Sequence, residues 1–352
     1  MRVNSKSLRS ALQACARAAD RRISLPVLSC AKLEAKAGRL TITASNLDVW
    51  VERHADCEGD LEPCCVNLNL LLKAVEHVDA ESCELKLNGK LVLKAGKSVD
   101  TFNTVPSNDF PLWPTAKLTP TAVNCADLAT GLNAVSWGCA DESIGRPELE
   151  NVAIQLSEAQ ILCLAANGNL LAHYRKAAIA APCAFQVPCD FIAALVSALE
   201  EPHSLLALSD NHVECTYEAG RTLVKLSDIG FIKGWERVLE IRSDKPSTRI
   251  QTELLKQPTA TCLLYHEKQT PQLDLEWVGE AITLSILGDL AQKEMTIPCV
   301  GDGKGEAHMN AKYLSKALPK FGDEVKFTPC DNASFWESGD LTVAIFQMRA
   351  RR

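Results

Sequence analysis

Several sequence features that mark membrane proteins and enzymes are missing from this chain of 352 residues. No apolar run approaches the roughly 18 residues of a membrane-spanning helix, and the N-terminal stretch MRVNSKSLRSALQACARAAD lacks the apolar core of a secretory signal. The GxxxxGK[ST] phosphate loop, the GxSxG elbow and the HExxH zinc motif are also absent. We therefore expect a cytoplasmic protein without a membrane partner.

Metal and cofactor signals are equally scarce. The 15 cysteines form neither a CxxC pair nor the Cys/His spacing of a zinc site. Scattered cysteines of this kind act as small buried apolar residues in a reducing cytosol. The Gly-rich stretch GDGKGEAH at 301–308 lacks phosphate-loop spacing and predicts an ordinary loop. We expect no metal, no cofactor and no catalytic centre.

The overall charge leaves nucleic acid open as a partner. Apolar residues make up 47% of the chain and charged residues 23%, which is ordinary for a soluble globular protein. The formal net charge is −7. An acidic total still allows a local basic surface to face a phosphate backbone.

What the chain does contain is a repeat. A short strand-turn-strand pattern recurs six times, and every second copy lies about 120 residues further on, which is a common domain size. Its turns lie at Gly38, Gly89, Ala159, Asn211, Gly279 and Asn332. The repeat predicts three similar domains, each built from two similar halves, over 1–119, 120–245 and 246–352.

Amphipathic helical segments accompany the hairpins. They are expected over 5–19, 67–78, 125–138, 190–199, 253–257 and 310–321. Pro258 should end or kink the fifth helix, because it lacks a backbone donor. Two helices per domain, packed on antiparallel hairpin-rich sheet, give an α+β fold.

Basic side chains follow two of these helices. Lys6, Arg9 and Arg17 share one face of the first helix, and Lys312 and Lys316 lie one turn apart on the sixth. Lys73 is exposed on the second. A solvated face is the ordinary interpretation of each stripe. If equivalent helices face one side, however, their stripes form a surface that can hold a phosphate backbone without reading bases.

Five segments, in order along nearly the whole chain, resemble the bacterial DNA sliding clamp, the beta subunit of the replicative DNA polymerase. They are LPVLSCAKLEAKAGRLTITASNLDVWV (25–51), FNTVPSNDFP (102–111), ILCLAANGNLLAHY (161–174), GFIKGWERVLE (230–240) and AIFQMR (344–349).

The resemblance implies a processivity factor rather than an enzyme. Two copies would join head to tail into a closed ring around double-stranded DNA, independent of DNA sequence, with a clamp loader and the replicative polymerase as partners. Dimer contacts would involve Phe102, Leu263 and Leu264. Because Leu263 and Leu264 follow the expected break at Pro258, we expect a weakened dimer contact. DNA-facing positions matched by the family add Arg22 and Arg146.

The family also implies a hydrophobic cleft between the second and third domains, which takes a short peptide from polymerases and other replication or repair proteins. By matched position its residues are Leu149, Ala166, Gly168, Leu171, Val238, Phe346, Met348 and Arg349. Ordinary core packing is the alternative for each of them.

The chain departs from the family pattern at several places. The family's His-Arg is Asn169-Leu170, its cleft-entrance proline is Lys233, and the basic pair at the fourth helix is Cys189-Asp190. The tyrosines before Leu149 are Pro147-Glu148. Two other hypotheses therefore stand beside the clamp: a clamp-like binding scaffold that no longer loads on DNA, and an enzyme on the same fold.

Overall fold

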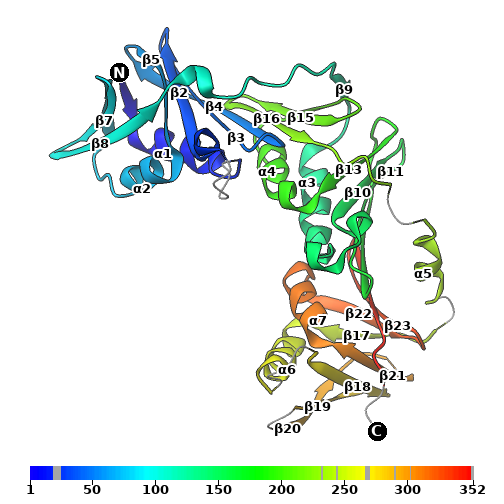
Figure 1. Cartoon of the computed structure of the whole chain (residues 1–352). Helices are drawn as coiled ribbons and strands as arrows, with labels where there is room; N and C mark the ends of the chain where they lie inside the picture. The colour runs from blue at the N-terminus through cyan, green and yellow to red at the C-terminus, as the bar shows by residue number, and fades with distance from the viewer. Residues whose placement is uncertain are drawn as a thin grey trace. The chain divides into compact units, whose positions relative to one another are not determined.

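The structure is a computed structural model that describes residues 1–18, 25–230, 233–242, 245–265, 270–288, 291–301 and 303–349. Two compact units make up the chain: Met1–Ala129 with Asp190–Leu226, and Thr130–Cys189 with Ser227–Arg352. Neither unit corresponds to one predicted domain, and the three-domain division stays a prediction. The predicted α+β class is confirmed, since helices accompany antiparallel sheets in the described residues (Figure 1).

The first unit contains a twelve-stranded antiparallel sheet in the order β1-β6-β7-β8-β5-β2-β3-β4-β16-β15-β14-β9. Its strands are β1 (Arg2–Asn4), β2 (Cys30–Lys36), β3 (Arg39–Ser45), β4 (Val49–Glu58), β5 (Leu61–Asn67), β6 (Ser82–Leu87), β7 (Lys90–Ala95), β8 (Ser98–Val105), β9 (Thr119–Thr121), β14 (Leu205–Leu208), β15 (His212–Tyr217) and β16 (Gly220–Lys225).

Helices α1 (Ser5–Cys15) and α2 (Leu68–Glu76) pack on each other in this unit, and α1 also contacts β3 and β4. The Asn4 side chain caps α1 by accepting hydrogen bonds from the amides of Lys6 and Ser7. Leu8 and Leu12 are fully buried. The apolar stripe predicted for the first helix therefore faces the sheet.

The second unit contains an eight-stranded sheet, β13-β10-β11-β12-β24-β23-β22-β17, and a four-stranded sheet, β20-β19-β18-β21. The strands are β10 (Asn151–Leu156), β11 (Gln160–Ala166), β12 (Leu170–Ala177), β13 (Cys183–Pro188), β17 (Thr248–Gln251), β18 (Gln272–Val278), β19 (Ala281–Leu287), β20 (Gln292–Pro298), β21 (Lys304–Asn310), β22 (Glu324–Pro329), β23 (Ala333–Ser338) and β24 (Leu341–Phe346).

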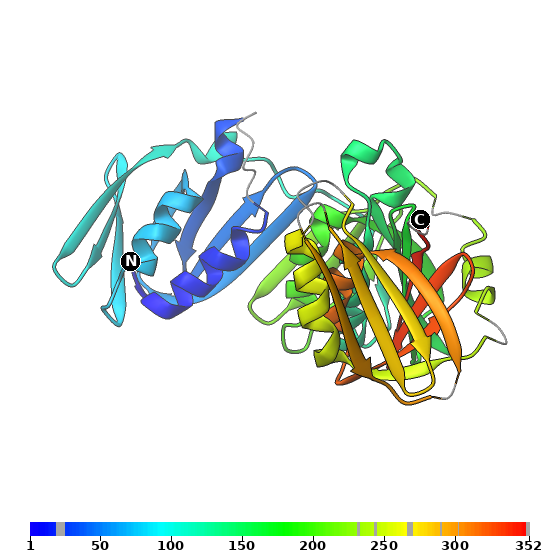
Figure 2. The same ribbon diagram turned by 90° about the horizontal axis from the view of Figure 1, so that it is seen from below.

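Three helices lie wholly in this second unit: α5 (Glu236–Glu240), α6 (Thr252–Tyr265) and α7 (Ala311–Ala317). Figure 2 shows α6 beside the four-stranded sheet, where it contacts β18, β19 and β20. The division between the two units falls inside α3 (Cys125–Val135) and within the first turn of α4 (Cys189–Leu199).

All six predicted hairpins are confirmed. They are the antiparallel pairs β2–β3, β6–β7, β10–β11, β14–β15, β18–β19 and β22–β23. Gly38 and Gly89 have φ angles of +83° and +67°. This left-handed conformation suits glycine, which explains why the Ala-Gly and Asn-Gly pairs mark turns.

The fifth helix differs from its prediction. α6 runs for 14 residues through Pro258 to Tyr265, so the expected end of this helix before Pro258 is wrong. The proline ring is buried. The Thr259 hydroxyl donates to the Leu255 carbonyl at 2.7 Å, which adds a side-chain bond to the turn where proline removes a backbone one. A weakened dimer contact was expected because the helix was expected to break at Pro258. The continuous helix removes that reason.

The cysteines are free thiols, and most are buried. Burial raises the pKa of Cys15 to about 12 and the pKa of Cys64 to about 11, so both stay protonated and pack as apolar groups. Among the described residues no cluster of His, Cys, Asp and Glu could hold a metal ion. Nor does this part of the chain contain a helix long and apolar enough to span a membrane.

Candidate functional site

An apolar cluster in the second unit brings together most of the predicted cleft residues. Its buried members are Leu149, Ala166, Leu171, Cys330, Ala333, Phe335 and Ala344. The strand register explains the floor of this cluster. Leu171 lies opposite Ala166 on one side and Ala344 on the other, and Ala344 lies opposite Phe335. Directly opposed residues share a face of a sheet, so these four side chains form one row.

Residues 233–242, which we call the strap, pack against this row. Val238, Leu239 and Ile241 contact the cluster and are only partly buried, as is Phe346 at the end of β24. Arg242 forms an ion pair with Glu337, and its guanidinium lies 5.9 Å from the Phe335 ring centre. Strap and sheet thus pack half-buried apolar side chains against a buried apolar row.

Trp235 anchors the first part of the strap. It packs on the cleft cluster and also on a second cluster of Ala153, Leu162 and Leu164. Its ring lies 5.6 Å from that of His173. Burial lowers the pKa of His173 to about 4, with smaller contributions from the charges of Arg175 and Arg242. The imidazole is therefore neutral near pH 7.

The side chain of Gln347, which was not predicted as a site residue, holds the C-terminal segment in place. The Gln347 side chain accepts a 2.6 Å hydrogen bond from the His308 amide and donates a 2.9 Å bond to the Cys330 carbonyl. The Met348 amide donates to the His308 carbonyl at 2.7 Å. These bonds join the chain end to β21 and to the loop after β22. A glutamine between apolar residues was the available signal, but its partners are distant in sequence.

The remaining predicted cleft residues, Gly168, Met348 and Arg349, are not members of this cluster. Gly168, in the turn between β11 and β12, has a φ angle of +87° and is exposed. A Cβ there would lie 3.9 Å from the Leu149 side chain. Met348 lines a pocket of about 310 Å³ that also includes Lys245 and Lys304. The Arg349 carbonyl accepts a hydrogen bond from Gln272.

Not all predicted DNA-facing residues are equally available. Lys6 and Lys73 are exposed on α1 and α2. The Arg9 guanidinium donates to the carbonyls of Val75 and Val78, at 3.0 and 3.2 Å, and so caps the end of α2. Arg17 donates to the Ser197 hydroxyl. Arg9 thus has a structural task that its place in the basic stripe did not indicate.

The other predicted DNA-facing residues are placed as follows. Lys312 and Lys316 are exposed on α7. Arg146 is exposed and forms a 2.9 Å ion pair with Glu148, one of the residues at which the chain departs from the family pattern. Arg22 lies outside the described residues.

The residues predicted for the dimer contact lie on or near unpaired edges. Phe102 in β8 is half-buried and lies opposite Leu91 of β7. Within the described residues, only Thr104 and Val105 of β8 pair with β5, so the rest of β8 has a free edge. Leu264 of α6 is 78% exposed and Leu263 is half-buried. The neighbouring four-stranded sheet ends at β20, whose outer edge has no strand partner in the described part.

The comparisons with known proteins agree with one another. Residues 1–114 match the model of the DNA polymerase III beta subunit, N-terminal domain. The beta sliding clamp of Pseudomonas aeruginosa is 26% identical over 349 residues, covering 94% of this chain and 93% of the relative. The Pseudomonas putida beta sliding clamp is 26% identical over 282 residues, covering 76% and 75%.

Solved structures extend the match to 99% of the chain. The Pseudomonas aeruginosa DNA polymerase III subunit beta, all of which is covered, gives a TM-score of 0.86 at 21% identity. The Thermotoga maritima beta subunit gives 0.89 at 17% identity, with 99% of it covered. The chain is thus similar to the bacterial beta sliding clamps, in its first 114 residues by the family model and in fold along nearly its whole length.

Proposed function

We propose that this clamp relative is a DNA polymerase processivity factor. It encircles duplex DNA without reading its sequence and tethers the replicative polymerase and other replication or repair proteins through the cleft. The observation that carries this proposal is the convergence of Leu149, Ala166, Leu171, Val238 and Phe346 on one surface. These five residues come from four separate parts of the sequence, and only Ala166 and Leu171 are neighbours in one hairpin.

Ring closure is the second part of the proposal. A two-subunit ring needs two identical head-to-tail contacts between different surfaces of each copy. The free edges of β8 and β20 supply such surfaces, because an unpaired strand edge offers backbone groups to another chain. Phe102 lies on β8, and α6, which contacts β20, carries Leu264. We infer a homodimer in the cytoplasm, placed on DNA by a clamp loader and without catalysis of its own.

Two measurements test this function. Sedimentation should give a dimer at micromolar concentration, and the loaded protein should stay on circular DNA but leave the same DNA once it is cut. A strict monomer, or equal release from circular and linear DNA, would contradict the ring. The cleft is tested by peptide pull-down with the wild type and with Met348→Ala, which should bind less.

A binding scaffold that no longer loads on DNA is not favoured by the comparisons. The two functions are still separable by experiment. A scaffold would bind partner peptides yet give no increase in polymerase processivity when loader and primed circular DNA are supplied. The clamp should do both.

A further inference from the structure

A pocket of about 420 Å³ lies beside the strap, on the other side of Trp235 from the cleft cluster. Its walls come from β10, from β13 and from residues 233–236. Ala153 lies opposite Gln186 and Gln155 opposite Ala184, so these four residues share one face of the sheet. This volume is within the range of ligand-binding sites.

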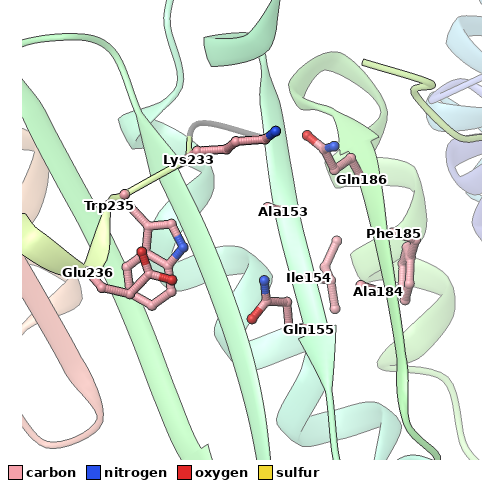
Figure 3. Close-up of a pocket in the computed structure, with 10 residues that line it drawn as sticks. Ala153, Ile154, Gln155, Ala184, Phe185, Gln186, Lys233, Trp235 and Glu236 are labelled. Carbon is pink, nitrogen blue, oxygen red and sulfur yellow. The ribbon is translucent and has the colours of Figure 1, made fainter. Parts of the chain in front are cut away.

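The polar groups of the pocket are only partly satisfied. The Gln186 Nε2 donates to the Ile229 carbonyl, but its buried Oε1 has no hydrogen-bond partner among the residues that the structure describes. Figure 3 shows the Lys233 ammonium and the Gln186 amide at one end of the pocket, and Glu236 is a further lining residue. Among the described residues, no ion pair involves Lys233. A ligand at this end should offer a donor to Gln186 and a negative charge to Lys233.

The pocket and the cleft cluster share one residue, Trp235. Trp235 packs on the cleft cluster and also on the cluster of Ala153, Leu162 and Leu164. Ala153 is itself a wall of the pocket. In the strand register, Ala153, Leu164 and His173 form the row two residues along from the Ala166–Leu171 row of the cleft. A chain bound in the cleft needs only to cross Trp235 to enter the pocket.

We propose that this pocket binds the flank of the partner segment, as an extended stretch of polypeptide that carries an acidic side chain. A peptide N–H supplies the donor for Gln186, a carboxylate pairs with Lys233, and the Trp235 ring gives an apolar surface between them. Lys233 stands where the family has its cleft-entrance proline. The chain would therefore select acidic flanks through a residue of its own. This inference rests on the proposed function, since it needs a partner in the cleft.

Peptide display tests the inference with random sequences in place of a named partner. The full-length protein is immobilised and a library of random peptides is selected against the wild type and against Lys233→Glu. We expect apolar anchors in both selections, with Asp or Glu at a fixed distance from the anchors for the wild type. Lys233→Glu should replace these acidic residues by Lys or Arg, because it reverses the charge of the pocket.

One selected peptide and its version with the acidic residue changed to lysine are then measured by fluorescence anisotropy. The lysine version should bind the wild type about two- to fivefold more weakly, the range of an exposed ion pair, and Lys233→Glu should reverse the order. Lys320→Glu, which changes another exposed lysine of the same unit, should leave both affinities unchanged.

The outcomes separate the two proposals. An apolar consensus without an acidic flank would overturn the pocket inference and leave the cleft intact. No apolar consensus, or one that survives Val238→Glu, would overturn the cleft. An acidic preference that persists in Lys233→Glu would place the acidic contact elsewhere and also overturn the inference.

Discussion

At the scale of single residues, side chains that bridge distant segments were the hardest to predict. Leu149, Leu171 and Phe346 could be expected from positions matched to the resembling family. Gln347 offered only a weak signal, a glutamine between apolar residues. Its role depends on His308 and Cys330, which become neighbours only when β21 and β22 are in place. Arg9 shows the same limit, since its carbonyl partners lie 66 and 69 residues away.

Gln347 should control the cleft through the position of the chain end. Gln347→Leu removes both side-chain hydrogen bonds and leaves the His308 amide and the Cys330 carbonyl without a partner, which should lower the free energy of unfolding by roughly 1–3 kcal/mol. Partner-peptide affinity, measured by anisotropy at a temperature where the variant is folded, should also fall. Gln347→Glu keeps the acceptor for His308 and should lose less. Equal peptide affinity for wild type and Gln347→Leu would contradict this role.

His173 predicts how stability depends on pH. Its folded pKa, about 4, lies below the ordinary value of 6.5, so the unfolded chain takes up a proton first as the pH falls. The contribution of the neutral imidazole to the free energy of unfolding is complete above pH 6.5 and is lost toward pH 4. At pH 5 the loss is about 2 kcal/mol. Urea unfolding of wild type and His173→Phe at pH 7 and pH 5 should show a smaller loss for the variant. Equal losses would mean that the imidazole is not neutral in the fold.

At the scale of elements, turn chemistry was a better guide than helix-breaking rules. The six hairpins were predicted from a repeated strand-turn-strand pattern, and in four of them a pair of turn residues marks the turn. The full length of α6 was not predicted, because proline removes a backbone hydrogen bond from a helix and is expected to end it. In the structure the Pro258 ring is buried, and the Thr259 hydroxyl donates to the Leu255 carbonyl. Tertiary packing therefore decided the outcome at Pro258.

Replacing Pro258 tests whether the buried proline ring offsets the backbone hydrogen bond that proline removes. Pro258→Ala restores a backbone donor toward the Leu254 carbonyl, a gain of about 3 kcal/mol in helix propensity. It also removes about two buried CH₂ groups, worth roughly 0.8 kcal/mol each, and frees the unfolded chain. The net increase in the free energy of unfolding should be about 1 kcal/mol by urea titration. Because α6 is unbroken, dimer dissociation should not change. A destabilised variant would show that the buried ring contributes more than the lost bond.

At the scale of the whole molecule, the proposed function requires an acidic protein to hold DNA. With a net charge of −7, contact must come from local groups, and the four lysines predicted to face DNA, Lys6, Lys73, Lys312 and Lys316, are exposed on helices. Arg9 and Arg17 already donate to protein acceptors. Retention by a closed ring needs only weak attraction to the backbone, so a sparse set is sufficient for the proposed function.

Charge reversal of these four lysines should therefore impair DNA binding without impairing dimerisation or peptide binding. The quadruple Glu variant should dimerise and bind partner peptides like the wild type, but it should lose loading on circular DNA and the salt dependence of DNA binding, whose slope follows the number of phosphate contacts. The matched control is a Glu variant at Lys36, Lys97, Lys117 and Lys320, which are also exposed and bring the same net charge. Arg9→Ala should instead act on folding, lowering the free energy of unfolding by roughly 1–2 kcal/mol through the lost cap on α2. If both quadruple variants lost loading equally, total charge would be the cause, and the helical lysines would not form the DNA-facing surface.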